Sequence, residues 1–346
     1  MIVRLSCSDV GIDELNVISS VIDNGYLGMG SYVEQFELAL KDYLGTNSHV
    51  ICVNSGTAAL HLSLQSLDIS HGDEVLVPSI TYLASFQAIT ACGAIPVACD
   101  VSPLTLFIDP DDARNRITRS TKAIMPVHYA SSNLGIDPIY SLASEFGLHV
   151  VEDAAHSFGS YGDNGLIGST ENMICFSFDG IKNITSGEGG AIVTNDDSLA
   201  SYIRDARLLG VAGDSIRRST GQRTWFPDVH IQGWRYHMSN VFAAIGLSQL
   251  EKSSDLFSKR KRLVQAYLTQ LSTIDSIQLL RLNHSALVPH IFPIRIPACK
   301  RDRVRRLLGE DGIQTGFHYF PNHLLTKFRV SYSLPVSESA GETLIS

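Results

Sequence analysis

The 346-residue sequence has few charged residues and no long apolar run. Charged residues make up 18% of the chain, and its net charge of −8 comes with no basic block of the kind that follows a phosphate backbone. No uninterrupted apolar segment approaches the length of a bilayer span, and the first residues lack the apolar core of a secretory signal. We therefore expect a cytoplasmic protein that binds neither nucleic acid nor membrane.

Cysteine pairs with a metal-binding or redox spacing are also missing, because none of the six cysteines forms a C-x-x-C pair. Most of them lie in apolar stretches, where a reduced thiol packs as a small hydrophobic group. We therefore predict core residues rather than disulfides or zinc ligands, and we expect no metal site. The six are Cys7, Cys52, Cys92, Cys99, Cys175 and Cys299.

The chain does contain enough apolar residues, 44% of the total, for an ordered globular protein with one large and one smaller domain. Short β-branched runs alternate with helical patterns between about residues 50 and 196. This alternation predicts an α/β fold with a mainly parallel sheet of about seven strands, at least one of them able to run antiparallel, covered by helices on both faces. The predicted strands are 49–54, 74–78, 95–100, 122–128, 149–153, 173–178 and 191–194.

Helical patterns occupy most of the segments between these strands. The predicted helices are 57–67, 81–92, a short one after Asp109, 137–146 and 197–209, and an irregular polar stretch then runs to residue 232. Residues 239–272 are strongly helical, and the remainder predicts a small α+β domain with strands near 290–296 and 313–319 and a helix at 301–308. We place a large domain at 1–245 and a smaller domain at 246–346.

Two segments place polar groups directly after buried strands. In Ser55-Gly56-Thr57 a strand ends in a small-residue turn that opens a helix, and the N–H groups there can bind an anion, although this motif taken alone favours an ordinary helix cap. Asp153 ends another buried strand, at the edge where open α/β sheets bind ligands. A buried carboxylate needs a partner, and a metal, a salt bridge and a protonated heterocycle all remain open.

A third segment places Lys182 just past a buried strand, ahead of a glycine-rich turn. A lysine in a solvated loop keeps its ammonium in water, whereas a lysine held in a pocket can lose its proton and form a Schiff base. An anion site, a carboxylate for a ring nitrogen and a lysine amine are together what pyridoxal 5′-phosphate requires. The combination predicts that cofactor more specifically than any one segment does.

With these segments in place, the whole sequence resembles the DegT/DnrJ/StrS family of nucleotide-sugar aminotransferases, which are fold-type I pyridoxal-phosphate enzymes. Some segments are most similar to those of family members that act on UDP-linked 4-keto sugars, among them Val127-His128-Tyr129 and Thr315-Gly316-Phe317-His318. The motifs that carry the resemblance are Gly25-Tyr26-Leu27-Gly28, Ser55-Gly56-Thr57-Ala58-Ala59-Leu60, Gly72-Asp73-Glu74-Val75, Gly93-Ala94-Ile95-Pro96-Val97, Glu152-Asp153-Ala154-Ala155-His156, Phe176-Ser177-Phe178 with Lys182, and Gly233-Trp234-Arg235-Tyr236-His237.

The resemblance implies a role for each candidate residue of the cofactor site. Lys182 would form the Schiff base with the cofactor and move the substrate proton, Asp153 would pair with the pyridine nitrogen, and His156 would lie near the 3′-hydroxyl. Tyr82 would stack on the ring, although a helix aromatic can also be core, and Ser177 can also cap a turn. The implied phosphate ligands are Gly56, Thr57 and Ser177.

The resemblance also implies a homodimer with its active site at the subunit interface. Relatives have the motif Gly-Tyr-Asn-x-Arg, whose asparagine reaches the partner subunit's phosphate, and here Arg235 and His237 stand at its asparagine and arginine positions. A guanidinium can also bind phosphate. Tyr26 and His318 fall in segments that line the sugar-nucleotide site of relatives. The chain ends at Ser346, earlier than relatives usually do, which predicts a small domain shorter than theirs.

These features predict an aminotransferase that moves an amino group from L-glutamate to the keto carbon of a nucleotide-linked keto-deoxysugar, in the closest motif match a 4-keto sugar. Biosynthesis of surface polysaccharide such as O-antigen is the expected purpose, since bacterial relatives serve it. One alternative is a pyridoxal-phosphate sugar dehydratase, disfavoured because such enzymes have histidine at the position of Lys182. The other is a catalytically silent member that binds a sugar nucleotide or regulates a partner.

Overall fold

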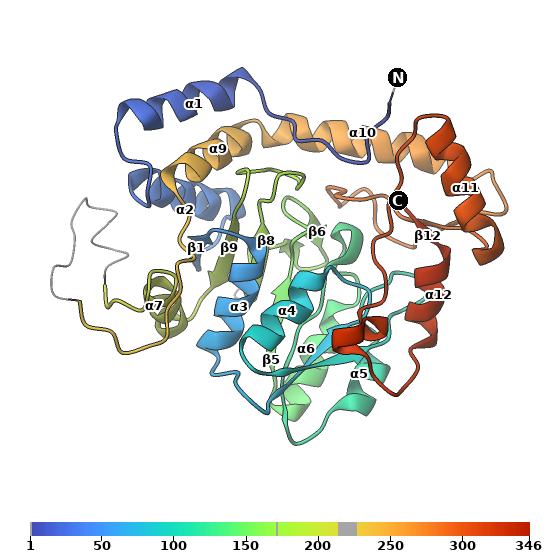
Figure 1. The fold of residues 1–346 in the computed structure, drawn as a ribbon, viewed down its shortest axis with the longest axis horizontal. Coiled ribbons are helices and arrows are strands. Elements are labelled where there is room, and N and C mark those ends of the chain that lie inside the picture. The colour runs from blue at the N-terminus through green and yellow to red at the C-terminus, as the bar shows by residue number, and fades with distance from the viewer. Residues whose placement is uncertain (1, 171, 214–226) are drawn as a thin grey trace.

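The computed structural model describes residues 2–170, 172–213 and 227–346 (Figure 1). Its centre is a seven-stranded sheet in which β9 alone runs antiparallel to its neighbours, so the predicted mainly parallel sheet is confirmed. The apolar runs are fully buried in the inner strands, as parallel sheets covered on both faces require. In spatial order the strands are β1 (His49–Val53), β9 (Gly190–Thr194), β8 (Met173–Ser177), β5 (His149–Asp153), β4 (Thr121–Ile124), β2 (Glu74–Pro78) and β3 (Ile95–Cys99).

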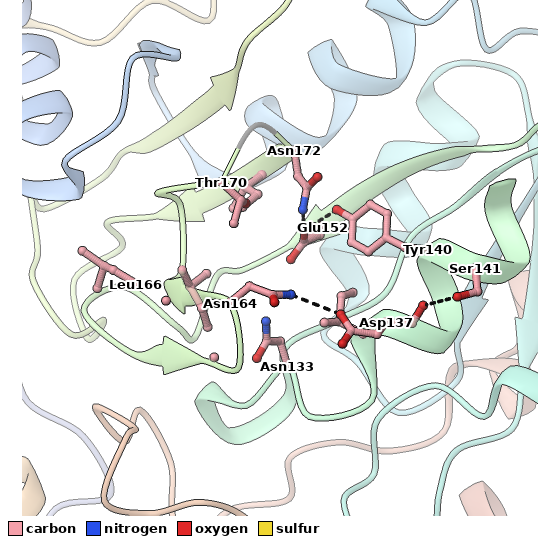
Figure 2. Close-up of a pocket in the computed structure, with 14 residues that line it drawn as sticks. Asn133, Asp137, Tyr140, Ser141, Glu152, Asn164, Leu166, Thr170 and Asn172 are labelled. Carbon is pink, nitrogen blue, oxygen red and sulfur yellow. Dashed lines mark hydrogen bonds between the residues drawn. The ribbon is translucent and has the colours of Figure 1, made fainter.

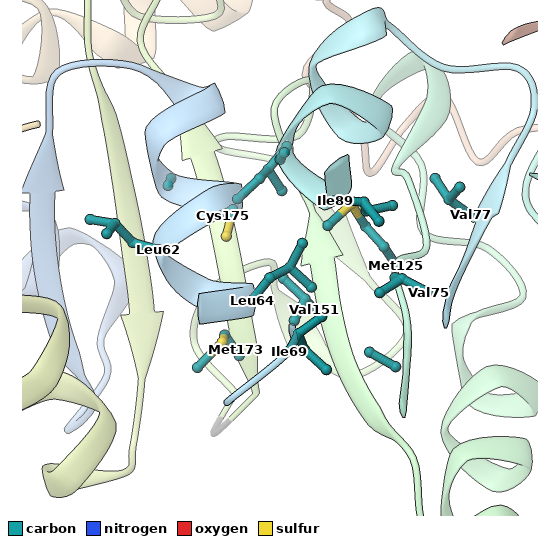
Figure 3. Packing of buried hydrophobic residues seen from close by; sticks show 14 of the residues in the cluster. Leu62, Leu64, Ile69, Val75, Val77, Ile89, Met125, Val151, Met173 and Cys175 are labelled. Carbon is teal, nitrogen blue, oxygen red and sulfur yellow. The ribbon is translucent and has the colours of Figure 1, made fainter. Parts of the chain in front are cut away.

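Helices pack on both faces of this sheet. One face is covered by α3 (Gly56–Ser66), α4 (Leu83–Ala91) and α7 (Asp197–Ala206), whose side chains form one core cluster with the strands. Figure 3 shows part of this cluster, with Leu64 of α3 beside Val151 of β5, whereas Leu62 points to the other side of α3. The other face is covered by α2 (Ser31–Leu44), α5 (Pro110–Arg116), α6 (Ile136–Phe146) and α9 (Asn240–Glu251).

The remaining elements lie mainly at the two ends of the chain. They are α1 (Ile12–Asp23), α10 (Ser253–Leu271), α11 (Ala298–Glu310), α12 (Pro335–Thr343), the 3-10 turns η1 (Tyr129–Ser131), η2 (Asn322–Leu324) and η3 (Thr326–Phe328), the hairpin of β6 (Tyr161–Gly162) and β7 (Gly165–Leu166), and an antiparallel sheet of β10 (Gln278–Leu279), β11 (Ile294–Arg295) and β12 (Leu344–Ile345). None of the helices that the structure describes is both long enough and apolar enough to span a bilayer.

The strand predicted at 313–319 is wrong. Only Ile313 forms a bridge, with Val3, and the next N–H groups bond in two directions: that of Gln314 to Val3 O and that of Gly316 to Ser346 O. Because these donors serve two different segments, no continuous ladder forms. The strand expected at 290–296 is reduced to β11, and the helical region 239–272 is divided into α9 and α10 at Lys252.

Several other expectations have mixed outcomes. Cys52, Cys99 and Cys175 are buried and all six thiols are free, but Cys7 and Cys299 are exposed, so the core prediction is wrong for these two. Residues 214–226 of the irregular stretch before residue 232 lie outside the described residues. Residue 245 lies inside α9, and the division into domains 1–245 and 246–346 stays a prediction.

Candidate active site

Several of the predicted site residues gather where strands end. Asp153 is the last residue of β5, Ser177 is the last residue of β8, and Gly56 opens α3 shortly after β1. Strands β5 and β8 are parallel, and β1 and β8 both run antiparallel to the β9 between them, so all three have their carboxyl ends at one edge of the sheet. This is the edge where open α/β sheets bind their ligands.

Asp153 is buried at this edge and is held by two donors. The hydroxyl of Ser85 on α4 donates to Oδ2 at 2.7 Å, and the backbone N–H of Ala155 donates to Oδ1 at 3.2 Å. Burial raises the pKa of the carboxyl above its usual value, although Ser85, Ala155 and the charge of Lys182 act in the opposite direction. The chain therefore leaves this carboxylate only partly compensated.

Lys182 lies in the turn that follows β8, where its backbone N–H donates to Asp179 O at 3.0 Å. Its Nζ lies 3.4 Å from Nε2 of His290. Burial lowers the pKa of the amine, while the charges of Asp153 and Asp179 raise it, and the net change is a lowered pKa. A lowered pKa favours the neutral amine, which is the form that reacts with aldehydes. This favours the Schiff-base interpretation over that of a solvated loop.

His156 is buried beside Lys182, and its ring is surrounded by other rings. Its Nε2 lies 2.9 Å from the hydroxyl of Tyr319, and its ring centroid lies 4.4 Å from that of His290. Burial and the charge of Lys182 hold the pKa of His156 well below 6.5, so the ring is neutral at pH 7. Its buried Nδ1 has no hydrogen-bond partner among the described residues, so that nitrogen is available to a bound group.

The predicted phosphate ligands lie side by side at the start of α3. A Cβ placed on Gly56 would come within 2.9 Å of the Cβ of Ser177, so only glycine allows this approach. Ser55 caps the helix by accepting the N–H of Ala58 at 3.1 Å, and Ser177 Oγ accepts the N–H of Asp179 at 3.4 Å. Thr57 is exposed in the first turn, where helix N–H groups lack partners within the helix.

Tyr82 and His318 lie at the rim of the same group of residues. Tyr82 is 59% exposed, too much for a core aromatic, and its ring centroid lies 5.8 Å from that of Tyr319. The Nδ1 of His318 is hydrogen-bonded to Ser346 Oγ. Burial and the charge of Lys182 lower the pKa of His318, which places this ring within electrostatic range of the amine.

Arg235 and Tyr26 have their described contacts elsewhere. Arg235 is exposed, and its carbonyl accepts from the side chain of Asn54 at 3.3 Å, next to the start of α3. Tyr26 is 40% exposed, packs on Gly30, and its carbonyl accepts from Asn240 at 3.0 Å. No described contact joins either residue to Lys182.

Sequence reasoning missed three residues that contact the site: Ser85, His290 and Tyr319. Ser85 follows Tyr82 at helical i+3 spacing, so the sequence held a signal that its hydroxyl faces the same edge. Tyr319 is the direct neighbour of the predicted His318. His290 lies in no chemical motif and is 108 residues from Lys182, so only the folded chain brings the two together.

A cavity of about 450 Å³ lies on the side of β5 opposite to Asp153 and Lys182 (Figure 2). Glu152 faces it, and Tyr140 and Asn172 donate to Oε1 of this carboxylate at 2.5 and 3.1 Å. Successive strand residues point to opposite faces, which explains why Glu152 faces this cavity while Asp153 faces Lys182. None of the predicted site residues is among the described residues that line the cavity.

Comparisons with known proteins identify the family of the chain. The model of the DegT/DnrJ/EryC1/StrS aminotransferase family matches residues 9–346. The chain belongs to this aminotransferase family. The aminotransferase TlmJ from Streptoalloteichus hindustanus is 30% identical, with 100% of this chain and 92% of that chain covered and a TM-score of 0.91. DesV from S. venezuelae is 33% identical over 96% of this chain and 87% of that chain, with a TM-score of 0.87. The PLP-form of the putative sugar aminotransferase Spr1654 from Streptococcus pneumoniae is 26% identical, with 100% and 93% covered and a TM-score of 0.89.

The aminotransferase uses pyridoxal phosphate, and its buried residues fit this cofactor. Lys182 supplies an amine largely removed from water, and Asp153 supplies a carboxylate with remaining capacity for a donor. The buried Nδ1 of His156 is free of described partners, and the close approach of Gly56 to Ser177 leaves helix N–H groups beside a hydroxyl. When bound, the cofactor supplies an electron sink that stabilises negative charge on the substrate carbon.

Proposed function

We propose that this aminotransferase moves the amino group of L-glutamate to the keto carbon of a nucleotide-linked keto-deoxysugar, most simply a 4-keto sugar. The observation that carries the proposal is the convergence of Lys182, Asp153 and His156 at one edge of the sheet, in a chain similar throughout to the putative sugar aminotransferase Spr1654. Synthesis of surface polysaccharide such as O-antigen, in the cytoplasm, is the setting that we propose for this reaction.

Each site residue has a proposed role. Lys182 would hold the cofactor covalently, and its Nζ, as a neutral amine, would move the proton between the substrate carbon and C4′ of the cofactor. Asp153 faces the ring nitrogen and His156 the ring hydroxyl, and Tyr82 covers one ring face. Gly56, Thr57 and Ser177 bind the cofactor phosphate. The protein is a homodimer with its active site at the subunit interface, where Arg235 binds the partner subunit's phosphate. Tyr26 and His318 contact the sugar nucleotide.

Lys182 gives the most direct test of this function. Borohydride treatment of the purified protein should fix one cofactor on Lys182, and added glutamate should change the cofactor absorbance with release of 2-oxoglutarate. Lys182→Ala should prevent fixation and lower turnover by about 10²–10⁴-fold or more, the size of a lost acid–base group. The exposed lysine of β4, as Lys122→Ala, is the matched control and should leave both measurements unchanged. Normal turnover by folded Lys182→Ala would refute the assignment.

The substrate is tested with a panel of nucleotide-linked 3-keto and 4-keto sugars and glutamate. Mass spectrometry should show replacement of the keto oxygen by an amine on at least one 4-keto sugar. Loss of water without gain of nitrogen would instead indicate the dehydratase. Unchanged sugars, with no response to glutamate, would indicate a silent binding protein.

A further inference from the structure

His290 contacts two of the proposed site residues at once. Its Nε2 lies 3.4 Å from Nζ of Lys182, and its ring centroid lies 4.4 Å from that of His156. It enters the site from the segment that precedes β11, far in sequence from both partners. The imidazole therefore contacts both the amine and the buried ring of His156, and no motif of the sequence indicated this.

Two polar side chains hold the segment of His290 against that of His156. The amide of Asn183, next to Lys182, donates to His156 O at 3.2 Å and to Val288 O at 3.0 Å. The hydroxyl of Ser131 donates to His156 O at 2.6 Å and accepts the N–H of His290 at 3.0 Å. These bonds fix the backbone on both sides of the contact between the two rings.

Arg260 on α10 joins the segment of His290 to the turn of Lys182. Its guanidinium donates to Pro289 O at 3.3 Å and to Lys182 O at 3.0 Å. Burial lowers the pKa of Arg260, although the charge of Asp9 raises it, so the chain holds this cation in a partly dry position. One side chain thus sets the distance between the backbones that carry the amine and the imidazole.

The chemical state of His290 suits a hydrogen bond with the amine. Burial and the charge of Lys182 hold the pKa of His290 well below 6.5, so its ring is neutral at pH 7. A neutral imidazole has one acceptor nitrogen, and at Nε2 it can accept a hydrogen from Nζ.

We propose that His290 is a positioning residue for Lys182, whose amine it holds by a hydrogen bond at Nε2, beside His156. A flexible lysine stem has several rotamers, and a fixed partner reduces the number that the free amine samples. The role concerns how the lysine meets the cofactor and the substrate carbon. The proposed role of His290 therefore does not depend on which sugar is the acceptor.

The test compares His290→Leu, which keeps the bulk and removes the nitrogen, with His290→Gln, which keeps a polar group able to hydrogen-bond. The full chain is stripped of cofactor, and pyridoxal phosphate is added. Samples are quenched with borohydride at successive times, and mass spectrometry measures the fraction of the protein with cofactor attached to Lys182. We expect His290→Leu to slow attachment about tenfold, and to lower kcat of the glutamate half-reaction about tenfold with KM for glutamate changed less than threefold. His290→Gln should recover most of both rates.

His284→Ala is the matched control, because it removes a histidine six residues earlier on the same segment, beside Phe292 and outside the site. It should attach cofactor at the wild-type rate, and circular dichroism should show all variants folded. Wild-type attachment by folded His290→Leu would overturn the proposal. The proposal would also be wrong if folded His290→Gln attached the cofactor as slowly as His290→Leu. If His290→Leu does not fold, a tenfold slower attachment in His290→Gln would contradict the proposal. Normal attachment of cofactor by a wild-type enzyme that aminates no keto sugar would refute the proposed substrate and leave this role standing.

Discussion

Two neighbouring carboxylates on β5 are treated differently by the fold. Burial raises the pKa of Glu152, but its partners His128, Tyr140 and Asn172 more than offset this, and its pKa is lowered. Asp153, with Ser85 and one N–H as donors, keeps a raised pKa. The partners of Glu152 within the chain thus compensate its charge, and it has a structural role. Asp153 can still accept a hydrogen bond from outside the chain, such as one from a protonated ring nitrogen.

Ser85→Ala tests this interpretation of Asp153. The substitution removes the donor at Oδ2, which should raise the pKa of Asp153 further and weaken its pairing with a protonated ring nitrogen. A hydrogen bond to a charged group contributes about 1.5–3 kcal/mol, so we expect pyridoxal phosphate to bind roughly 10- to 100-fold more weakly. Titration of the absorbance of the cofactor gives the dissociation constant.

Ser63→Ala is the control for this experiment. Ser63 is an equally buried serine, on α3, and its hydroxyl lies 3.2 Å from the thiol of Cys175 instead of a carboxylate. Its removal should leave the dissociation constant of the cofactor unchanged. Equal affinity in the wild type and Ser85→Ala would show that Asp153 does not need this serine to bind the ring.

At the scale of elements, the site depends on how closely α3 approaches the end of β8. Gly56→Ala would place a Cβ within 2.9 Å of the Cβ of Ser177, a distance that neither backbone can accommodate without moving. Because the helix start and the strand end are both proposed phosphate ligands, we expect cofactor affinity to fall about tenfold or more, at a stability cost of about 1–3 kcal/mol. Absorbance titration and urea unfolding measure the two effects.

Gly309→Ala provides the matched control, since Gly309 lies in α11 and a Cβ added there would meet nothing within 4 Å. There the same change should stabilise the chain by about 0.5–1 kcal/mol, because alanine is the better helix former, and should not alter cofactor binding. If Gly56→Ala bound the cofactor as tightly as Gly309→Ala, the approach of α3 to Ser177 would have no part in the site.

The strands and helices of the sheet were predictable because each is a local pattern. The apolar runs that became β1, β2 and β5 are continuous, and Ser55 and Asp109 cap the helices α3 and α5. The order of Lys182, Asp153 and Gly56 along the chain was likewise readable from residue types. By contrast, the segment around Gln314 has strand-like residues, but its partners are the two ends of the chain, which no local pattern specifies. His290 escaped prediction for the same reason.

At the scale of the whole molecule, the site is built from segments that span most of the chain. Gly56 and Ser85 come from the first hundred residues, Asp153 and Lys182 from the middle, and His290 with Tyr319 from the last sixty. Both termini contribute to the same end of the molecule (Figure 1), where Val3 pairs with Ile313 and Ser346 with Gly316. The site can therefore form only when the chain as a whole has folded.

This assembly buries histidines and sets a direction for the stability of the protein with pH. The pKa is lowered by burial for five of them: His61, His156, His284, His290 and His318. Between these lowered values and about 6.5, the unfolded chain binds protons that the folded chain does not. The free energy of unfolding is therefore highest above pH 6.5 and falls as the pH decreases below it.

We expect urea unfolding of the cofactor-free chain to give nearly constant stability from pH 8 to 7 and a steep loss from pH 6.5 to 5. Each buried histidine contributes a slope of up to about 1.4 kcal/mol per pH unit. Glu14, whose pKa is lowered to about 2, loses its contribution only at lower pH and stays outside this window. His156→Gln should remove one proton's share of the slope. A stability that is flat from pH 8 to 5 would mean that these rings are hydrated and protonate in the folded state, and the dry site inferred for Lys182 and His156 would then be wrong.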